Sequence, residues 1–475
     1  MRTKEKSAKK NKAPLGLKEG AGYMMGDAGN LFVLTYISFF LKVFYTDILK
    51  ISPKKTANLF LFTRLWDVVN DPLWGNIVSK RKPTANGKYR PYIKNLAIPL
   101  ALSELICFFN LSRFTSSPVL LLVFAYVTYI SFGMLYTGVN VPYGSLASVI
   151  TDDPEGRTLL STARSIGSGV GGAAPLLIAP MIIYNKVSDG ASGTYNVANS
   201  RGMFTFAVIM AACSVLAYFF CYSATIERVP SAAEPQFNMK KTYSALFRSR
   251  PFVTLALSGI LISGQLQFGS LNQYLYKNYF CNTNLSIFGT IAQYLPMAVM
   301  IPFVPKLVKR YGKKEIITVG TFFSALASII TYIAKPGRDQ PMFFIVMLLL
   351  TGFGYSFVSI TNWAVVTDVI DYQEYKTGIK CESSIYAVYT FCRKLGQTAA
   401  DYGGLMLLSK VGYDASVMSN AGYVSGVSEG ILTVCTIIPA IAYTLIFIIF
   451  KFGYPLTKKN LVPVYDYIRN RNETK

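Results

Sequence analysis

Histidine is absent from the 475-residue chain. Without it the protein cannot build a zinc–histidine centre, a serine–histidine catalytic pair or an imidazole proton relay. Enzyme classes that depend on those groups are excluded. Any proton that the protein carries must therefore be held by a carboxylate.

Charged residues are also scarce: they make up 15% of the chain, whereas 52% of the residues are apolar. That balance leaves too little polar surface to coat a soluble globule of this size. Apolar runs of about 18 residues or more recur from Asn30 to Phe452, and each is long enough to cross a hydrocarbon core about 30 Å thick as a helix. A closed β-barrel would instead show alternating segments of about ten residues. The sequence predicts an all-α membrane protein and not an enzyme.

Cysteine and acidic residues are few as well. The seven cysteines are scattered, odd in number and mostly within apolar runs, which predicts small buried residues and not a disulfide framework. Lys and Arg outnumber Asp and Glu by 47 to 24, but the basic residues gather in short segments between the apolar runs. We interpret this excess as a topology signal and exclude nucleic acid as a partner.

The apolar runs predict twelve helices that cross the cell membrane. Their expected ranges are 28–49, 55–79, 94–112, 118–149, 160–184, 202–224, 252–276, 284–308, 315–334, 341–366, 383–410 and 427–452. The segments after the second, eighth and tenth ranges are basic, and Lys and Arg are retained on the cytoplasmic side. Both termini are therefore expected in the cytoplasm. The basic first twenty residues lack an apolar stretch and are expected to form a tail, not a cleavable signal.

A long polar interval divides the twelve predicted helices six and six. The expected parts are a tail (1–22), a bundle (23–224), a central cytoplasmic loop (225–251), a second bundle (252–452) and a second tail (453–475). The basic turns after the second and eighth helices resemble each other, which indicates a duplicated half. Such a duplication predicts the major facilitator fold, with the substrate cavity between the halves near the membrane midplane.

The second predicted helix carries two acids. Asp67 and Asp71 are four residues apart and therefore share one helix face, with Arg64 one turn before Asp67 and Asn70 beside Asp71. An ionised carboxylate at mid-membrane costs roughly 2.5–3.5 kcal/mol, and two of them also repel each other. They predict a coupling-cation site for sodium or a proton. The alternative is that Arg64 and Asp67 form a structural ion pair while Asp71 meets water.

The fourth predicted helix ends in a polar, proline-containing stretch from Tyr136 to Tyr143. Uncharged oxygens there, on Thr137 and Asn140, are suitable for completing a sodium site, because hard cations prefer oxygen donors. The same residue types also bridge helices structurally.

Further cations and acids lie within or beside the predicted helices. Arg164 precedes a glycine-rich run, Gly167–Gly172, which is expected to allow close helix packing. A buried guanidinium is suited to bidentate contact with hydroxyls or a carboxylate, although Arg164 could instead reach toward the cytoplasm. Arg393 and Lys394 lie in the eleventh helix, and we expect one of them to face the cavity. A gating network on the cytoplasmic side is expected from Arg64, Asp368, Asp371 and Lys376, with solvated loop charge as the alternative.

Several of these motifs, in this order, resemble the glycoside-pentoside-hexuronide:cation symporter family. The resemblance runs from Tyr23 to about Tyr413 and rests on motifs that include Tyr23–Asp27, Arg64–Pro72, Gly87–Pro91 and Asp368–Lys376. It implies that Asp67 and Asp71 are the cation carboxylates, with Asn70 and Thr137 as neighbouring oxygen ligands. It also implies that Tyr136, Arg164 and Lys394 contact the sugar or support its site.

Three departures from the family pattern change the expected chemistry. Asn140 replaces an acid of the cation site, which leaves sodium and proton coupling both open. Gly144 replaces a tryptophan that stacks on sugar, leaving Tyr143 as the nearby aromatic. In the first helix Leu31 replaces the sugar-binding acid and Asn30 its neighbouring lysine. Without that acid, Arg164 and Lys394 would leave the cavity net positive, which predicts an anionic sugar such as a hexuronide or glucuronide.

The sequence therefore predicts cation-coupled symport of a small glycoside by alternating access, with no cofactor other than the coupling sodium ion or proton. The expected partners are the sugar and membrane lipid, and the chain is expected to work as a monomer. Two alternatives remain: transport of a lipid or amphiphile on the same fold, and proton-coupled transport of neutral pentosides or galactosides. Glu104 and Asp401 also lie within predicted helices, and the sequence assigns no partner to either.

Overall fold

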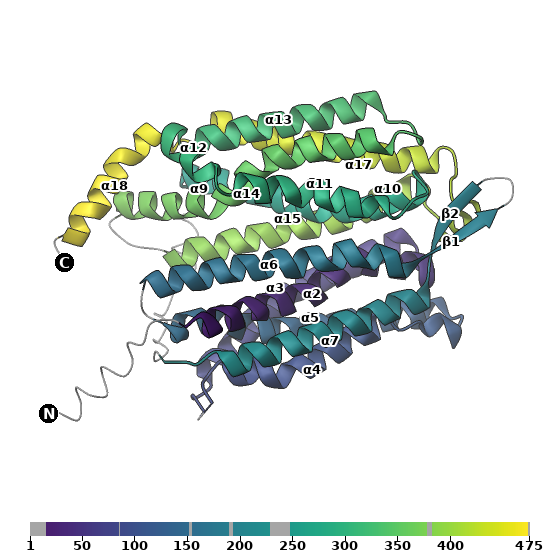
Figure 1. Ribbon diagram of the computed structural model, residues 1–475, viewed down its shortest axis with the longest axis horizontal. Helices are drawn as coiled ribbons and strands as arrows, with labels where there is room; N and C mark the ends of the chain where they lie inside the picture. Colours follow the sequence, from purple (N-terminus) through teal and green to yellow (C-terminus); the bar gives the residue numbers. More distant parts are fainter. Residues whose placement is uncertain are drawn as a thin grey trace. The chain divides into compact units, whose positions relative to one another are not determined.

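Helices make up most of the computed structural model, which describes residues 16–84, 86–151, 154–189, 193–228, 248–377 and 382–473 (Figure 1). The chain forms two compact units. One comprises Met1–Pro235 with Ala415–Ser419, and the other comprises Gln236–Asp414 with Asn420–Lys475. The division between them falls within the predicted central loop, of which residues 229–247 lie outside the described part.

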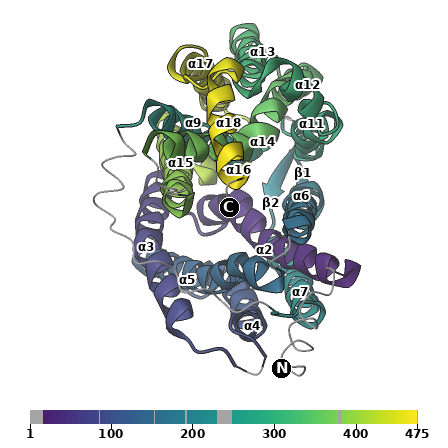
Figure 2. The same ribbon diagram turned by 90° about the vertical axis from the view of Figure 1, so that its left-hand side faces the viewer.

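Six long helices of the N-terminal unit match the first six predicted ranges. They are α2 (Leu17–Val43, continued by the π-helical turn η1, Phe44–Ile48), α3 (Pro53–Lys80), α4 (Arg90–Cys107), α5 (Pro118–Ile150), α6 (Pro154–Ile183) and α7 (Ser200–Ala224). Helix α2 packs against α6 and α7, α4 lies against α5 and α7, and α3 packs on α5 (Figure 2). The contact between α3 and α5 brings together the predicted cation ligands of the second and fourth helices.

The helices of the C-terminal unit match the remaining six ranges. They are α9 (Arg250–Phe268) with α10 (Asn272–Asn278), α11 (Leu285–Met300) with α12 (Val304–Tyr311), α13 (Lys313–Ala334), α14 (Pro341–Thr377), α15 (Glu382–Lys410) and α17 (Val427–Ile448). α15 packs along α9, and α13 packs against both α14 and α17. Their buried side chains, from Phe252 on α9 to Leu461 beyond α17, form a continuous apolar core.

Among the described residues, eight helices are long and apolar enough to cross a membrane, and a ninth span arises if α11 and α12, bent by 59°, count as one. The other three predicted spans coincide with α3, α4 and α15. These helices carry more charge, as α3 does with Arg64, Asp67 and Asp71. In α3, the charged residues that predict a cation site are thus the same residues that lower the apolar character of the span.

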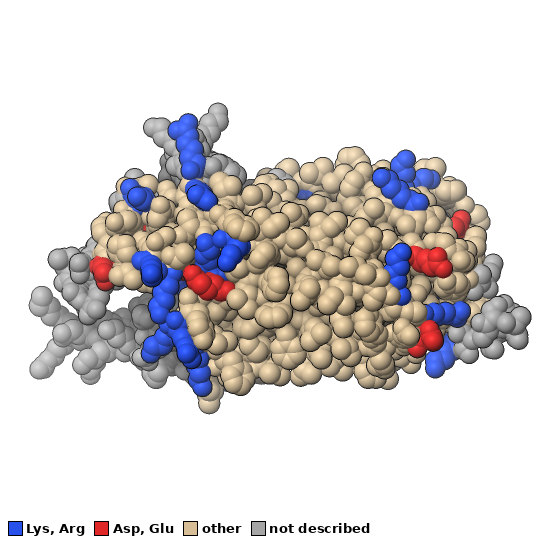
Figure 3. All heavy atoms as spheres, turned by 90° about the horizontal axis from the view of Figure 1, so that it is seen from above, with Lys and Arg blue, Asp and Glu red and all other residues tan. Residues whose placement is uncertain are grey.

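The outer faces of the helices are apolar, as a lipid-facing surface requires. Phe62 on α3, Leu102 on α4 and Val170 on α6 leave 58%, 53% and 54% of their surface exposed. On the face drawn in Figure 3, Lys, Arg, Asp and Glu gather toward the two ends of the helices, and other residues fill the band between. This distribution places the hydrocarbon region along the middle of the helices.

Within the described residues, a two-stranded hairpin departs from the all-α prediction. β1 (Tyr184–Asp189) pairs antiparallel with β2 (Gly193–Ala198), so that Tyr184 lies opposite Ala198. The predicted tails also contain helix: α2 begins at Leu17, and α18 spans Lys458–Glu473. Helix α18 is held by tertiary contacts that the sequence order does not reveal, because the Tyr465 hydroxyl donates to Asp368 and the Tyr467 ring meets Tyr375 edge-on.

The basic turn before α4 is fastened to the end of α7 by one acid. Glu227 accepts hydrogen bonds from the backbone N–H groups of Lys88, Tyr89 and Arg90, each at 2.7–2.8 Å. These N–H groups would otherwise be unsatisfied at a helix start, where an anion is also favoured by the helix dipole. Gly87 adopts φ +102°, and a β-carbon there would stand 2.5 Å from the Glu227 carboxylate, so the turn requires glycine.

The glycine-rich run of α6 allows close packing on α2, as predicted, but not at every glycine. A β-carbon at Gly167 would lie 2.1 Å from the carbonyl oxygen of Met24, whereas one at Gly169 would meet nothing within 4 Å. We expect Gly167→Ala to lower the melting temperature of the detergent-solubilised protein by several degrees relative to Gly169→Ala, since overpacking costs about 1–3 kcal/mol. Both changes gain similar helix propensity, so their difference reports the helix contact. Equal melting temperatures would contradict this packing.

Candidate functional site

Asp67 and Asp71 face α5 within the N-terminal unit. Oδ1 of Asp67 lies 3.3 Å from the position that a β-carbon of Gly133 would occupy. One turn further along α5, the Thr137 hydroxyl donates a hydrogen bond of 3.0 Å to Oδ1 of Asp71. Both carboxylates therefore approach a neighbouring helix of their own bundle, and Thr137 lies at one of them.

Arg64 pairs with Asp67, as the structural alternative anticipated. A guanidinium nitrogen of Arg64 lies 3.6 Å from Oδ2 of Asp67, and the two side chains are 17% and 18% exposed. One arginine does not balance two carboxylates, however. Taken together, Arg64, Asp67 and Asp71 carry a formal charge of −1, which one sodium ion or one proton would neutralise. The ion pair and a cation site are therefore compatible.

Two amides accompany the carboxylates. Asn70 on α3 is 2% exposed, and within the described residues its amide nitrogen has no hydrogen-bond partner. Asn140 is half-buried and follows Thr137 by one turn of α5. Their predicted role as oxygen ligands of a cation remains a prediction.

Arg164 has an acidic partner that the sequence-based charge count left out. Its Nε atom lies 3.2 Å from Oδ1 of Asp27 on α2, and Ser168 donates its hydroxyl to the other oxygen of the same carboxylate. The expected positive charge around Arg164 did not include this carboxylate, and Asp27 balances the charge of Arg164. The Arg164 side chain is still 43% exposed and lies over the Tyr143 ring, 5.7 Å from its centroid.

The other predicted substrate residues of this unit are more deeply placed than Arg164. Tyr143 is fully buried, stacked on Tyr23 at 4.7 Å, and donates its hydroxyl to the Tyr23 carbonyl. Asn30 is 1% exposed. Its amide nitrogen donates to the carbonyl of Gly26, and its amide oxygen accepts a hydrogen bond from the Tyr218 hydroxyl. In this structure Tyr143 and Asn30 hold helices together.

Tyr136 is half-buried on α5, and its ring packs beside Phe132. It lies within electrostatic range of Arg64, Asp67, Asp27 and Arg164. Tyr136 therefore stands between the predicted cation residues and the predicted sugar residues, and its sugar contact remains a prediction.

In the C-terminal unit the two basic residues of α15 take different positions. Arg393 donates to the Ser263 hydroxyl on α9 at 3.0 Å and lies over the Trp363 ring on α14. Arg393 is thus engaged with two neighbouring helices of its bundle, whereas Lys394 is half-buried on the same helix. Of the two, Lys394 remains the predicted substrate ligand.

Asp368 holds three elements together at one end of the C-terminal unit. It is 2% exposed, lies 2.6 Å from Nζ of Lys313 on α13, and accepts a hydrogen bond from Tyr465 on α18. Burial, together with this carboxylate, raises the pKa of the Tyr465 hydroxyl well above its usual value. Asp371 is half-buried, and Lys376 is exposed beside the rings of Tyr372 and Tyr375. Asp368 is thus a buried carboxylate that pairs with Lys313 and accepts a hydrogen bond from Tyr465, and not a solvated loop charge. The gating role of Arg64, Asp368, Asp371 and Lys376 remains a prediction.

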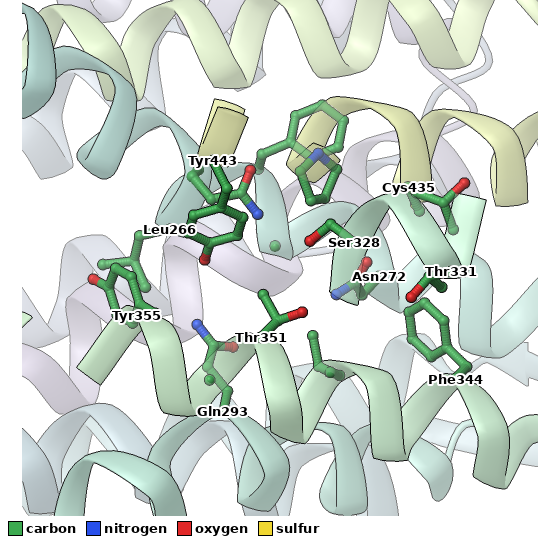
Figure 4. Close-up of a pocket in the computed structure, with 17 residues that line it drawn as sticks. Leu266, Asn272, Gln293, Ser328, Thr331, Phe344, Thr351, Tyr355, Cys435 and Tyr443 are labelled. Atoms are coloured by element: carbon green, nitrogen blue, oxygen red, sulfur yellow. The ribbon is translucent and has the colours of Figure 1, made fainter. Parts of the chain in front are cut away.

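The C-terminal unit also contains a cavity, lined by both polar and apolar side chains, that the sequence did not single out. Helices α9, α10, α11, α13, α14 and α17 line a space of about 60 Å³. Figure 4 shows amide and hydroxyl groups at it, including those of Asn272, Gln293, Ser328 and Thr351. At about 10–15 Å³ per water it has room for a few water molecules and not for a sugar ring. Its lining residues carry no formal charge. In the sequence, the feature that could have indicated this cavity is the repeated occurrence of Gln, Asn, Ser and Thr within apolar spans.

Two apolar bundles that each carry buried ionisable groups define a multi-pass membrane transporter of the major facilitator fold. The sequence model of the MFS/sugar transport protein family matches residues 22–458, and the chain belongs to that family. The protein is therefore a transporter of the sugar-transport class and not an enzyme.

Curated relatives extend over nearly the whole chain. An uncharacterized symporter, YjmB of Bacillus subtilis, is 30% identical, with 96% of each chain covered. A putative sulfoquinovose importer of Salmonella typhimurium is 28% identical, covering 97% of this chain and 94% of that one. A glucuronide carrier protein homolog of Escherichia coli is 27% identical, with 95% of each covered. Each of these is a similar protein over nearly its full length.

Solved structures share the fold at low identity. A bacterial homologue of the iron transporter ferroportin superposes with a TM-score of 0.65 at 13% identity, covering 93% of this chain and 100% of that one. A single-substitution variant of the nucleoside transporter NupG superposes with a TM-score of 0.63 at 12% identity, covering 92% of this chain and 100% of that one. At these identities the likeness establishes the fold alone.

Proposed function

We propose that this protein is a cation-coupled symporter of a small glycoside, in which Asp67 and Asp71 bind the coupling sodium ion or proton. The observation that carries the proposal is the pair of carboxylates on α3 facing α5, where Thr137 donates to Asp71 at 3.0 Å. The protein would lie as a monomer in the lipid of the cell membrane, with both termini in the cytoplasm.

Coupling follows from the electrostatics of this pair. With Arg64 beside Asp67, the three side chains keep a formal charge of −1 within the bundle. Moving that net charge through the hydrocarbon region costs energy, and a bound sodium ion or proton removes the cost. Only the cation-loaded carrier would then reorient easily, which links cation entry to sugar entry.

The substrate that we propose is a glycoside with an acidic group, such as a hexuronide. Arg164 supports this proposal because its side chain is 43% exposed, and a guanidinium binds carboxylate or sulfonate oxygens in bidentate fashion. The relatives named for glucuronide and for sulfoquinovose point to the same class, since both sugars are anionic. Asp27 partly neutralises Arg164, so Arg164 would attract an acidic substrate less strongly than an unpaired arginine would.

Uptake into membrane vesicles tests both parts of this proposal. Acidic glycosides and matched neutral glycosides are offered under an imposed sodium gradient and, separately, under an imposed proton gradient. We expect accumulation of acidic glycosides under one of the two gradients. Accumulation of neutral glycosides only would reject the proposed substrate class, and uptake that neither gradient drives would reject cation coupling.

A further inference from the structure

Glu104 is a buried acid that the proposed coupling mechanism does not use. It lies near the C-terminal end of α4, and its side chain is 0% exposed. Within the described part of the chain neither carboxyl oxygen has a hydrogen-bond partner, and no ion pair reaches it. Asp67 and Asp71 differ in this respect, because Arg64 and Thr137 contact them.

The walls around Glu104 are apolar. Residues three and four positions away on the same face of α4 are all buried, namely Leu100, Ala101, Cys107 and Phe108. From α2, Tyr36 lies close enough to interact electrostatically with Glu104. The Tyr36 hydroxyl is already used, however, since it donates to the carbonyl of Met203 on α7 at 2.9 Å, while the Tyr36 ring stacks on Phe108.

Among the described residues, the titratable groups that interact with Glu104 bring it no positive charge. They are Tyr36 from α2 and Cys107 from α4 itself. Beyond Tyr36 lie Tyr184 of β1 and, next to Tyr184, Asp47 of η1. Helix α5 faces Cys107 with the neutral hydroxyl of Thr128, and α7 faces Tyr36 with Met203 and Phe206. All of these groups are neutral or acidic, so they do not favour an ionised Glu104.

An isolated ionised carboxylate in such surroundings costs several kcal/mol even after the protein relaxes. Taking up a proton removes that cost, because the neutral acid needs no counter-charge. We infer that Glu104 is a proton-binding site inside the N-terminal bundle, separate from Asp67 and Asp71, and that it carries its proton in this structure. In a chain without histidine a carboxylate is the group available for this task. The ligand of the site is the proton itself.

Infrared difference spectroscopy on the purified full-length protein tests the inference directly. The spectrum of Glu104→Gln subtracted from that of the natural protein at neutral pH is expected to show the carbonyl band of a protonated carboxylic acid. The matched control is Glu429→Gln, because Glu429 is exposed at the start of α17 and is expected to lose only a carboxylate band. A carboxylate band in the Glu104→Gln difference would overturn the inference.

Thermal unfolding gives a second readout. Unfolding exposes Glu104 to water, where it releases its proton at neutral pH, so the native state binds one proton more than the unfolded state. Stability contributed by this group is then lost as the pH rises, and the melting temperature of Glu104→Gln relative to the natural protein is expected to increase from acid to neutral pH. Glu104→Leu, which also lacks the acid, carries the same test if Glu104→Gln does not fold. A difference independent of pH in the variant that folds would overturn the inference.

Neither measurement involves sugar uptake. The proposed symport could therefore fail while a protonated Glu104 is observed, and the reverse outcome is equally distinguishable.

Discussion

Asp67→Ala and Asp71→Ala are each expected to abolish accumulation of the glycoside against its gradient while leaving exchange of labelled for unlabelled sugar across the membrane. Accumulation requires that the cation be bound together with the sugar, whereas exchange needs only a carrier that reorients with sugar on both sides. Removing one acid changes the formal charge of the Arg64, Asp67 and Asp71 group from −1 to neutral, so the carrier no longer needs a cation to reorient. The measurement is uptake and counterflow in the same vesicles.

Thr137→Val provides a finer test of the same site. Thr137 donates to Asp71, and its hydroxyl oxygen is a suitable sodium ligand, so its loss should weaken the apparent affinity for sodium severalfold, in line with about 0.5–1.5 kcal/mol for a hydrogen bond. If the coupling cation is a proton, the same loss should instead strengthen its binding, because the hydrogen bond stabilises the ionised carboxylate. Thr128→Val is the matched control on α5, because the Thr128 hydroxyl donates to the carbonyls of its own helix. Full accumulation by both aspartate variants would refute the assignment of the cation site. Equal effects of the two threonine changes would argue against Thr137 as part of it.

Arg164→Gln is expected to raise the KM for acidic glycosides about 10- to 100-fold, with a much smaller change for neutral glycosides. The estimate follows from the roughly 1.5–3 kcal/mol of a hydrogen bond to a charged group. Asp27→Asn should act in the opposite direction, because it removes the carboxylate that shares the guanidinium with the substrate. The measurement is initial uptake rate against sugar concentration for one acidic and one neutral glycoside.

Arg201→Gln is the matched control, since Arg201 is exposed at the start of α7 and its loss removes the same charge from the same unit. Similar KM increases for acidic and neutral sugars would show that Arg164 positions α6 against α2 and does not read the charge of the substrate.

Asp27 illustrates why the charge of the sugar site could not be derived from the sequence. It lies on α2, 137 residues before its partner Arg164, and nothing local indicates that the two helices place these side chains together. Lys313 and Asp368 are a second case, because they are joined across α13 and α14. The charge count from sequence treated Arg164 as unpaired, and the packing of α2 against α6 changed that result.

The hairpin of β1 and β2 and the cavity of the C-terminal unit also could not be predicted from the sequence. The hairpin is short and follows an apolar helix directly, so its alternating pattern is weak beside the long runs around it. The cavity collects amides and hydroxyls from six helices, and each of these groups looks ordinary within its own helix.

The sequence alone determined the helical membrane architecture and the placement of Asp67 and Asp71 on one face of their helix. Long apolar runs demand helices because the membrane core offers the backbone no water, and a spacing of four places two side chains on one face. Both rules are local, so they are legible in the order of residues. Only the tertiary structure decided which charges have partners: Thr137 for Asp71, Asp27 for Arg164, Lys313 for Asp368, and within the described chain no hydrogen-bond partner for Glu104. Those pairings depend on which helices touch and at what height, which is set by side-chain packing between segments far apart in the chain.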